Sequence, residues 1–298
     1  MKYRITHRTE YHYPRAISRS YNETHLAPRT TPDQQVLAHS LTIAPRPDYT
    51  SERTDYYGNR VTHFTIQRPH DQLAVTATTD VALEAPADPV AHGQGLPWEQ
   101  AVATTGSGTA ATALAVREFL LDSPLVETRP DLTDYARASF AAGQRLPEAV
   151  HHLMGRIHRD FAYDPMATTI STPLERVFRE RRGVCQDFAH LAIACLRGLG
   201  IAARYVSGYV ETAPADGTAR LIGADASHAW FAAHDPSLGW IDFDPTNNRM
   251  PGTQHITTAW GRDYADVSPL KGVIFGGSRG QRSHVAVDVQ RLPSEDEP

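Results

Sequence analysis

Cys185 is the residue of this sequence whose position best suits nucleophilic chemistry. It follows Gly183 and Val184 and stands at the first turn of a helix predicted over 184–199. A helix N-terminus presents unpaired N–H groups and the positive end of the helix dipole, and both favour a thiolate over a thiol. The position therefore predicts a reactive cysteine, whereas a cysteine at an arbitrary position is more often a small buried apolar residue.

Cys195, the other cysteine, shows that ordinary use. It lies in the middle of the same helix beside Ala192 and Leu196, away from the field of the helix terminus. Ten residues of helix separate the Cα atoms of Cys185 and Cys195 by ~15 Å, which is beyond the reach of a disulfide. We therefore expect two free thiols, of which only Cys185 is reactive.

A predicted hairpin supplies an imidazole and a carboxylate. Two apolar-rich runs flank the turn sequence DPSLG at 235–239, which is typical of a hairpin. In an antiparallel pair, a turn centred on residue 236 or 237 places His228 opposite residues 244–246, and Asp244 falls in that window. Nucleophilic acyl transfer needs a thiol, a base and a group that orients the base. We predict Cys185, His228 and Asp244 in these roles.

Two other residues are alternatives for these roles. Asp242 shares the strand face of Asp244 but lies two residues nearer the turn, ~7 Å along the strand, so we expect it to meet Trp230. His190 is near Cys185 in the chain, but it lies more than one helical turn from the thiol. Both rank below the residues chosen.

The elements that must position these residues fall into two parts. Residues 1–84 carry apolar side chains at every second position, which predicts strands and an all-β N-terminal domain, a sandwich. Residues 85–97 are rich in Pro, Gly and Ala and indicate a linker. Residues 98–290 predict an α+β catalytic domain, and residues 291–298 a disordered acidic tail. The helices of the catalytic domain are predicted at 109–122, 131–142, 147–161 and 184–199. Its strands are predicted at 203–210, 227–233, 240–244 and 284–290.

Three local features complete this prediction. Turn chemistry at 55–59 indicates a hairpin in the N-terminal domain. Trp230 and Trp240 flank the second hairpin, and we expect them to pack the sheet against the helix of Cys185. Arg197 lies on a polar stripe of that helix, which favours a solvated or domain-facing position.

Composition excludes several other classes of function. The chain has 298 residues, 41% hydrophobic and 21% charged, and its net charge of -5 gives no attraction to nucleic acid or anionic lipid. It has neither an apolar run of membrane-spanning length nor a signal-like N-terminus, so the cytoplasm is the expected location. Its 15 histidines lack metal-ligand spacing. No metal or other cofactor is expected, and the oligomeric state stays open.

Three sequence blocks together resemble the transglutaminase-like superfamily, in its bacterial branch with a β-rich N-terminal domain. They are GVCQDFAHLAIACLRGLGIAARYVSGYV, GADASHAWF and GWIDFDPTNN, which are similar to the three catalytic blocks of that family. Residues 26–29, 55–59 and 261–269 continue the likeness. The resemblance implies a papain-like core and a catalytic triad of Cys185, His228 and Asp244.

The oxyanion site of the family does not transfer as a whole. Animal transglutaminases place a tryptophan from upstream of the nucleophile there, and no tryptophan lies between Trp98 and Cys185. The backbone N–H of Cys185 is expected as one donor. The second donor stays open between Tyr163 and the side chain of Gln186, and Trp230 is a further candidate for the oxyanion or substrate site.

The expected activity is cysteine-dependent hydrolysis of an amide in a protein or peptide: a peptide bond, an isopeptide bond or a glutamine side chain. Hydrolysis is expected over transfer to an amine because water at ~55 M competes for the thioester unless the site excludes it. Amine transfer is the alternative within this chemistry. A binding or assembly protein that keeps only the fold is the other alternative. The segment 211–219 carries no specificity signal.

Overall fold

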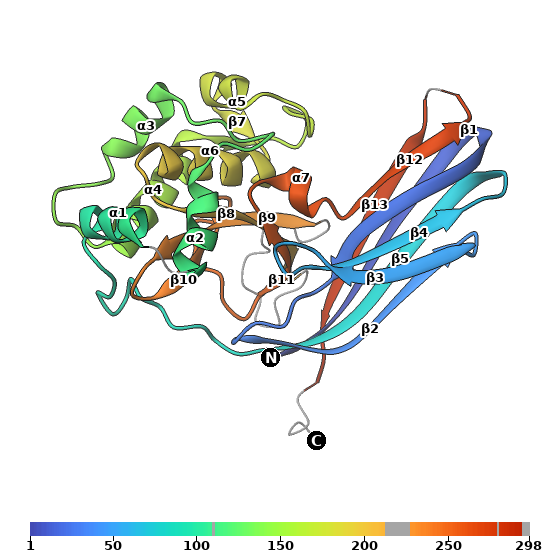
Figure 1. The fold of residues 1–298 in the computed structure, drawn as a ribbon, viewed down its shortest axis with the longest axis horizontal. Coiled ribbons are helices and arrows are strands. Elements are labelled where there is room, and N and C mark those ends of the chain that lie inside the picture. The colour runs from blue at the N-terminus through green and yellow to red at the C-terminus, as the bar shows by residue number, and fades with distance from the viewer. Residues whose placement is uncertain (109–110, 212–226, 279, 294–298) are drawn as a thin grey trace.

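The computed structural model describes residues 1–108, 111–211, 227–278 and 280–293, and Figure 1 shows a β-sheet part beside a helix-rich part. The first part holds the N-terminal strands that the alternation of apolar residues predicts. Along the first of them, Tyr3, Ile5, His7 and Thr9 are buried in turn. The strands are β1 (Lys2–Ala27), β2 (Gln34–Ala44), β3 (Tyr49–Thr54), β4 (Arg60–Ile66) and β5 (His70–Leu83).

The long strand β1 organises this sheet. Its first half pairs with β5 and its second half with β4, in the order β2-β5-β1-β4-β3. The register of β1 shifts between His12 and Ile17, and such irregularities bend a strand. Phe64 of β4 and Leu73 of β5 share one apolar cluster. The all-β character predicted for this part is confirmed.

The predicted turn at 55–59 joins β3 to β4. The carboxylate of Asp55 accepts the backbone N–H of Asn59 at 2.7 Å. Gly58 adopts a φ of 78°, which favours glycine. The turn therefore depends on the residue types that predicted it.

The C-terminal strands belong to the same sheet. β12 (Leu270–Gly276) and β13 (Arg282–Arg291) both pair antiparallel with β1, and Tyr3 lies opposite Arg291. In Figure 1 these red strands run beside the blue β1. This corrects the prediction that the last strand and all residues to 290 belong to the catalytic domain. Alternation identifies a strand, but its partner depends on contacts remote in sequence.

The second part places helices on one face of a sheet ordered β10-β9-β8-β11. Helix and antiparallel sheet in one part match the predicted α+β class. The strands are β8 (Ala203–Val210), β9 (His228–Asp235), β10 (Gly239–Phe243) and β11 (His255–Gly261), with the short parallel pair β6 (Ala162–Tyr163) and β7 (Arg182–Gly183) outside the sheet. The helices are α1 (Trp98–Ser107), α2 (Ala111–Arg117), the 3-10 turn Glu118–Leu120, α3 (Pro130–Arg137), α4 (Leu146–Asp160), α5 (Leu174–Glu180), α6 (Cys185–Gly198) and α7 (Tyr264–Val267).

Helix α6 is the core of this part. Every residue from Asp187 to Arg197 is buried, and the apolar ones pack against Ala229, Phe231 and Phe243 of the sheet. A helix that is buried on all sides cannot move without disrupting the core. The first residue of α6 is therefore held in a fixed place.

Arg197 helps to hold α6, and of the two positions predicted for it, solvated or domain-facing, the structure shows one that faces protein. Its side chain is buried, and the guanidinium donates to the backbone carbonyls of Phe119, Ala203 and Arg262. Arg197 faces protein because the 3-10 turn Glu118–Leu120, the first residue of β8 and the segment after β11 cover it.

Three tryptophans lie on the opposite face of the sheet from α6: Trp230, Trp240 and Trp260. Trp230 packs with Val206 and Ala232, and Trp240 and Trp260 pack against that cluster. Successive residues of a strand point to opposite faces, so Trp230 points away from the helix while Phe231 points toward it. The expectation that Trp230 and Trp240 pack the sheet against the helix of Cys185 is wrong.

Two side-chain amides join the β-sheet part to β11. Gln34 accepts the backbone N–H of Thr257 at 2.8 Å and donates to its carbonyl at 2.7 Å. Asn59 makes the same pair of bonds with the backbone of Trp260, at 3.0 and 2.9 Å. Arg29 stacks on the ring of Trp260 at 3.5 Å. These contacts satisfy backbone groups along an edge strand and fix the two parts together.

Some predictions fall on undescribed residues. Most of the 211–219 segment and the tail from 294 onward lie outside the described residues. Along the ranges that are described, no helix has both the length and the apolar character needed to cross a bilayer.

Candidate active site

Cys185 is the first residue of α6, as predicted, and its side chain is partly exposed. The backbone N–H of Val184 donates to Oδ2 of Asp187 at 2.8 Å, and the hydroxyl of Thr168 donates to the same oxygen at 2.6 Å. A Cβ on Gly183 would lie 2.7 Å from that oxygen, so the turn requires glycine. The buried carboxylate therefore fixes the helix start, and the thiol stands at the helix N-terminus.

Cys195 has the ordinary buried environment that the sequence predicts. It is fully buried in α6, and its thiol donates to the backbone carbonyl of Leu132 at 3.3 Å. Burial raises the pKa of Cys195 to about 12. Neither Cys185 nor Cys195 forms a disulfide.

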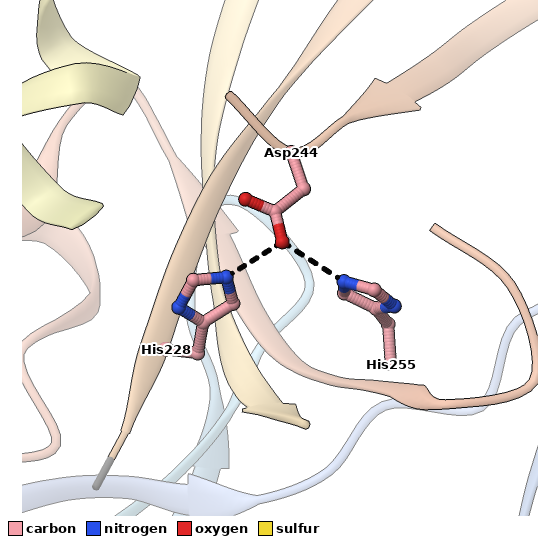
Figure 2. A group of neighbouring side chains, drawn as sticks. All are labelled: His228, Asp244 and His255. Carbon is pink, nitrogen blue, oxygen red and sulfur yellow. Dashed lines mark hydrogen bonds and ion pairs between the residues drawn. The ribbon is translucent and has the colours of Figure 1, made fainter. Parts of the chain in front are cut away.

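The structure brings His228 and Asp244 together, as the hairpin predicted. Nε2 of His228, the first residue of β9, lies 2.8 Å from Oδ2 of Asp244, just beyond the end of β10 (Figure 2). Both side chains are almost completely buried. The carboxylate can only accept, so Nε2 carries a proton and donates it.

The register of the hairpin lies at one edge of the predicted window. Gly239 pairs with Asp235 and Phe243 with Phe231, so the turn is centred on residue 237. Asp244 consequently contacts His228 diagonally across the strand pair instead of directly opposite it.

Asp242 makes the matching diagonal contact one step nearer the turn. Its Oδ2 accepts the indole N–H of Trp230 at 3.0 Å. The predicted division between the two carboxylates therefore holds in the structure: Asp242 meets Trp230, and Asp244 meets His228.

The Asp244 carboxylate accepts hydrogen bonds from several groups. Oδ1 accepts the backbone N–H groups of Thr246 and Asn247, at 3.0 and 3.2 Å. Oδ2 accepts His228 Nε2, the side-chain amide of Asn247 at 2.7 Å and His255 Nε2 at 3.1 Å. Burial by itself raises the pKa of Asp244, but the interactions with His228 and His255 outweigh it and hold the pKa well below its usual range. Asp244 is therefore ionised.

His228 carries a charge beside the thiol. Burial lowers the pKa of His228, but the Asp244 carboxylate outweighs burial, Cys185 adds to the upward shift, and the net pKa is about 10. Since Nε2 is bonded to Asp244, Nδ1 is the nitrogen available to Cys185. Nδ1 has no hydrogen-bond partner of ordinary geometry among the described residues. Catalytic hydrogen bonds often tighten only when substrate binds.

His255 is a member of this group that the sequence reasoning missed. It is the first residue of β11, a strand that the predictions omitted. The available signal was a histidine that opens a short run of strand-forming residues. Its approach to Asp244 follows from the pairing of β11 with β8, which no local pattern specifies.

The same three side chains could in principle hold a metal ion. The ligand atoms of His228, Asp244 and His255 lie within 4.8 Å of one another, and these residue types bind zinc. Both Nε2 atoms point at one carboxylate oxygen, so their protons occupy the space that an ion would need (Figure 2). The present geometry is that of a hydrogen-bond network. That the protein needs no metal stays a prediction.

The three candidates for the second oxyanion donor differ in their fit. Trp230 does not fit, because it is buried and its N–H is donated to Asp242. Gln186 is partly exposed at the second residue of α6, and its side chain donates to the carbonyl of Ile170 at 3.5 Å. Tyr163 is 37% exposed, and burial together with the charge of Cys185 raises its pKa. Gln186 and Tyr163 remain candidates.

His190 is not suited to the role of base. It is buried, and its Nε2 accepts the backbone N–H of Tyr264 at 3.2 Å. Burial lowers the pKa of His190 to about 4. The ring is neutral and has a structural partner.

Comparison with known families gives two matches. Residues 3–82 match the bacterial transglutaminase-like N-terminal region, and residues 133–245 match the transglutaminase-like superfamily. The second match contains Cys185, His228 and Asp244.

Individual proteins show similarity along nearly the whole chain. An uncharacterized protein of Mycobacterium tuberculosis is 42% identical over 294 residues, covering 97% of this chain and 92% of that protein. An uncharacterized protein of Mycobacterium leprae is 32% identical over 290 residues, covering 97% and 98%. The crystal structure of a protein from Cytophaga hutchinsonii, proposed to be a cysteine protease, has a TM-score of 0.75 and 24% identity, covering 100% of this chain and 93% of that one. This last likeness shows a shared fold.

Proposed function

Because the chain belongs to the transglutaminase-like superfamily, we propose that it hydrolyses an amide bond through a thioester on Cys185. His228 acts as acid and base, and Asp244 orients the imidazole. The observation that carries this proposal is the 2.8 Å hydrogen bond between His228 and the buried, ionised Asp244. It leaves the second ring nitrogen for a thiol at the start of α6.

Acylation begins with addition of the Cys185 sulfur to the amide carbonyl carbon, as the carbonyl π electrons move to oxygen. The proton on Nδ1 of His228 passes to the amide nitrogen as the C–N bond breaks and the amine leaves. The product is a thioester on Cys185 beside a neutral imidazole.

Deacylation uses the same groups in reverse. Nδ1 of His228 takes a proton from water as the water oxygen adds to the thioester carbon. Collapse of this intermediate breaks the C–S bond and releases a carboxylic acid. The thiolate and the charged imidazole are restored, and Asp244 keeps its charge throughout.

The developing oxyanion needs donors at the start of α6. The backbone N–H of Cys185 has no carbonyl partner within the helix, because the first N–H groups of a helix lack one. It also lies at the positive end of the helix dipole. Tyr163 or Gln186 supplies the second donor in this proposal.

The proposed substrate is a peptide bond, an isopeptide bond or a glutamine side chain in a protein or peptide of the cytoplasm. Hydrolysis is proposed over amine transfer because Cys185 is partly exposed, and water then reaches the thioester. A purely binding role has less support, since a scaffold has no use for an ionised Asp244 held against His228.

The proposal is tested by trapping the acyl-enzyme. Purified protein is mixed with glutamine-containing peptides and quenched in acid, and the mass of the fragment with Cys185 is measured. Release of ammonia or of cleaved peptide is followed with and without a fluorescent primary amine.

We expect a Cys185 adduct and hydrolysis that depends on Cys185. Cys185→Ala should abolish both, whereas Cys195→Ser should retain them because serine can still donate to Leu132. Turnover by Cys185→Ala equal to wild type would contradict the mechanism. Amine incorporation in excess of hydrolysis would show that the activity is transfer to an amine instead of hydrolysis.

A further inference from the structure

His255 reaches the Asp244 carboxylate from a second strand. Figure 2 shows the two imidazoles on different sides of the carboxylate, with both contacts on one oxygen. His228 comes from β9 and His255 from β11, and their Nε2 atoms lie 2.8 and 3.1 Å from Oδ2. The three side chains are buried. Asp244 is thus held by strands on both sides of β8, which separates β9 from β11.

The protonation of His255 follows from its partners. A carboxylate oxygen accepts only, so Nε2 of His255 must carry a proton. Its Nδ1 is buried and has no hydrogen-bond partner among the described residues. Burial lowers the pKa of His255, although Asp244 opposes this shift. The ring is therefore neutral, with its single proton on Nε2.

A neutral donor has a specific advantage at this point. A second charged imidazole on the same oxygen would repel the charge on His228 and reduce its share of the Asp244 charge. A neutral N–H restrains the carboxylate through a hydrogen bond and leaves its charge to His228. The charged and titratable groups that act on His255 are Asp244, His228 and Arg249, and His255 in turn acts on Asp242.

We propose that His255 is a positioning residue of the site, which donates from Nε2 to Asp244 and holds Oδ2 toward His228. This proposal rests on the proposed function of Cys185, His228 and Asp244. His255 does not touch the reacting atoms, so its effect on the thiol passes through the carboxylate and the imidazole of His228.

His255 also packs, and the test must separate packing from positioning. Its ring meets Trp230 edge to face at 5.4 Å between centroids. His255→Phe keeps an aromatic ring there and removes the donor. His255→Gln gives up the ring and keeps an amide N–H that reaches as far as Nε2. His234→Phe is the matched control, since His234 meets Trp240 in the same way at 5.1 Å and does not contact Asp244.

The experiment measures the rate at which iodoacetamide modifies Cys185 at two pH values. At about pH 6 free thiols are mostly protonated, and at about pH 10 they are ionised. For His255→Phe we expect a rate about 10- to 100-fold lower at the acid pH, the range of one hydrogen bond to a charged group. The rate at the alkaline pH should match wild type. His255→Gln should recover most of the loss, and His234→Phe should behave as wild type. In hydrolysis, kcat should fall while KM stays unchanged.

The proposal is overturned if, at about pH 6, iodoacetamide modifies Cys185 in folded His255→Phe at the wild-type rate. Equal losses in His255→Phe and His255→Gln, with matching losses of thermal stability, would assign His255 a packing role and overturn it as well. If iodoacetamide modifies wild-type Cys185 no faster than it modifies an unfolded peptide, the proposed function itself fails. The wild-type measurement alone reveals this outcome.

Discussion

Replacement of Asp244 by asparagine removes the charge at the centre of the network and also disturbs its hydrogen bonds. Both carboxylate oxygens only accept: Oδ1 from the backbone of Thr246 and Asn247, and Oδ2 from His228, His255 and the Asn247 amide. Asparagine replaces one of these oxygens by an NH2 group. Whichever way the amide turns, its donor faces other donors.

The magnitude follows from the pKa of His228. In wild type, Asp244 overcomes burial and raises that pKa from 6.5 to about 10. Without the carboxylate, burial remains, and the pKa falls below its ordinary value. Each unit by which that pKa lies below the pH lowers the charged fraction of His228 about tenfold, so a pKa about three units below neutral pH lowers this fraction roughly a thousandfold. We expect kcat to fall ~1,000-fold, within the ~10,000-fold known for loss of the carboxylate in a serine-protease triad.

Asp242→Asn is the matched control. Asp242 lies partly buried on the same hairpin, but its bond is to the indole of Trp230, and an amide oxygen can accept that N–H. We expect kcat within a few-fold of wild type, measured on the same substrate. Full turnover by Asp244→Asn with an inactive Asp242→Asn would refute the assignment of the orienting carboxylate.

Two other perturbations test the fold around the site. Asn59→Ala removes the amide that pairs with the backbone of Trp260, and we expect urea unfolding to show a free energy of unfolding about 3 kcal/mol lower because buried partners lose their bonds. The control is Gln35→Ala at an exposed position. Equal free energies of unfolding for the two variants would contradict the role of Asn59 in joining the two parts. The pKa of His190 is lowered to about 4 in the folded protein by burial. As pH falls below 6.5, His190 therefore takes up a proton in the unfolded chain before it does so in the folded protein. At pH 4 this difference lowers the free energy of unfolding by about 3 kcal/mol. His190→Gln keeps an acceptor for the backbone N–H of Tyr264, and its free energy of unfolding should fall less than that of wild type as the pH is lowered. The same pH dependence in both proteins would contradict the contribution assigned to His190.

Local signals were sufficient to place Cys185 at a helix start and His228 beside Asp244. Cys185 was found because a glycine turn and a helix start are adjacent in sequence. His228 and Asp244 were found because a short hairpin fixes its own register to within two residues. In each case the residues that determine the geometry lie within about twenty positions of one another.

Remote contacts account for what the sequence did not predict. His255 reaches Asp244 only because β11 pairs with β8, and β12 and β13 join β1 from the other end of the chain. The strand pattern placed Trp230 and Asp242 on one face, but it could not say which face α6 covers. The helix pattern could not say whether Arg197 faces solvent or protein, because the segments that bury it lie outside its helix.

The central claim is that the thiol of Cys185 is activated by His228 and Asp244. The measurement that tests it most directly is the rate of iodoacetamide modification of Cys185 across the pH range, resolved by peptide mapping. The references are the same peptide in unfolded protein and the folded variant His228→Ala.

We predict that folded wild-type Cys185 reacts at about pH 6 at least tenfold faster than the unfolded peptide, a pH at which free thiols are mostly protonated. His228→Ala should abolish this advantage, and buried Cys195 should stay unmodified in all folded samples. A rate for Cys185 that follows the unfolded peptide at every pH would contradict the account.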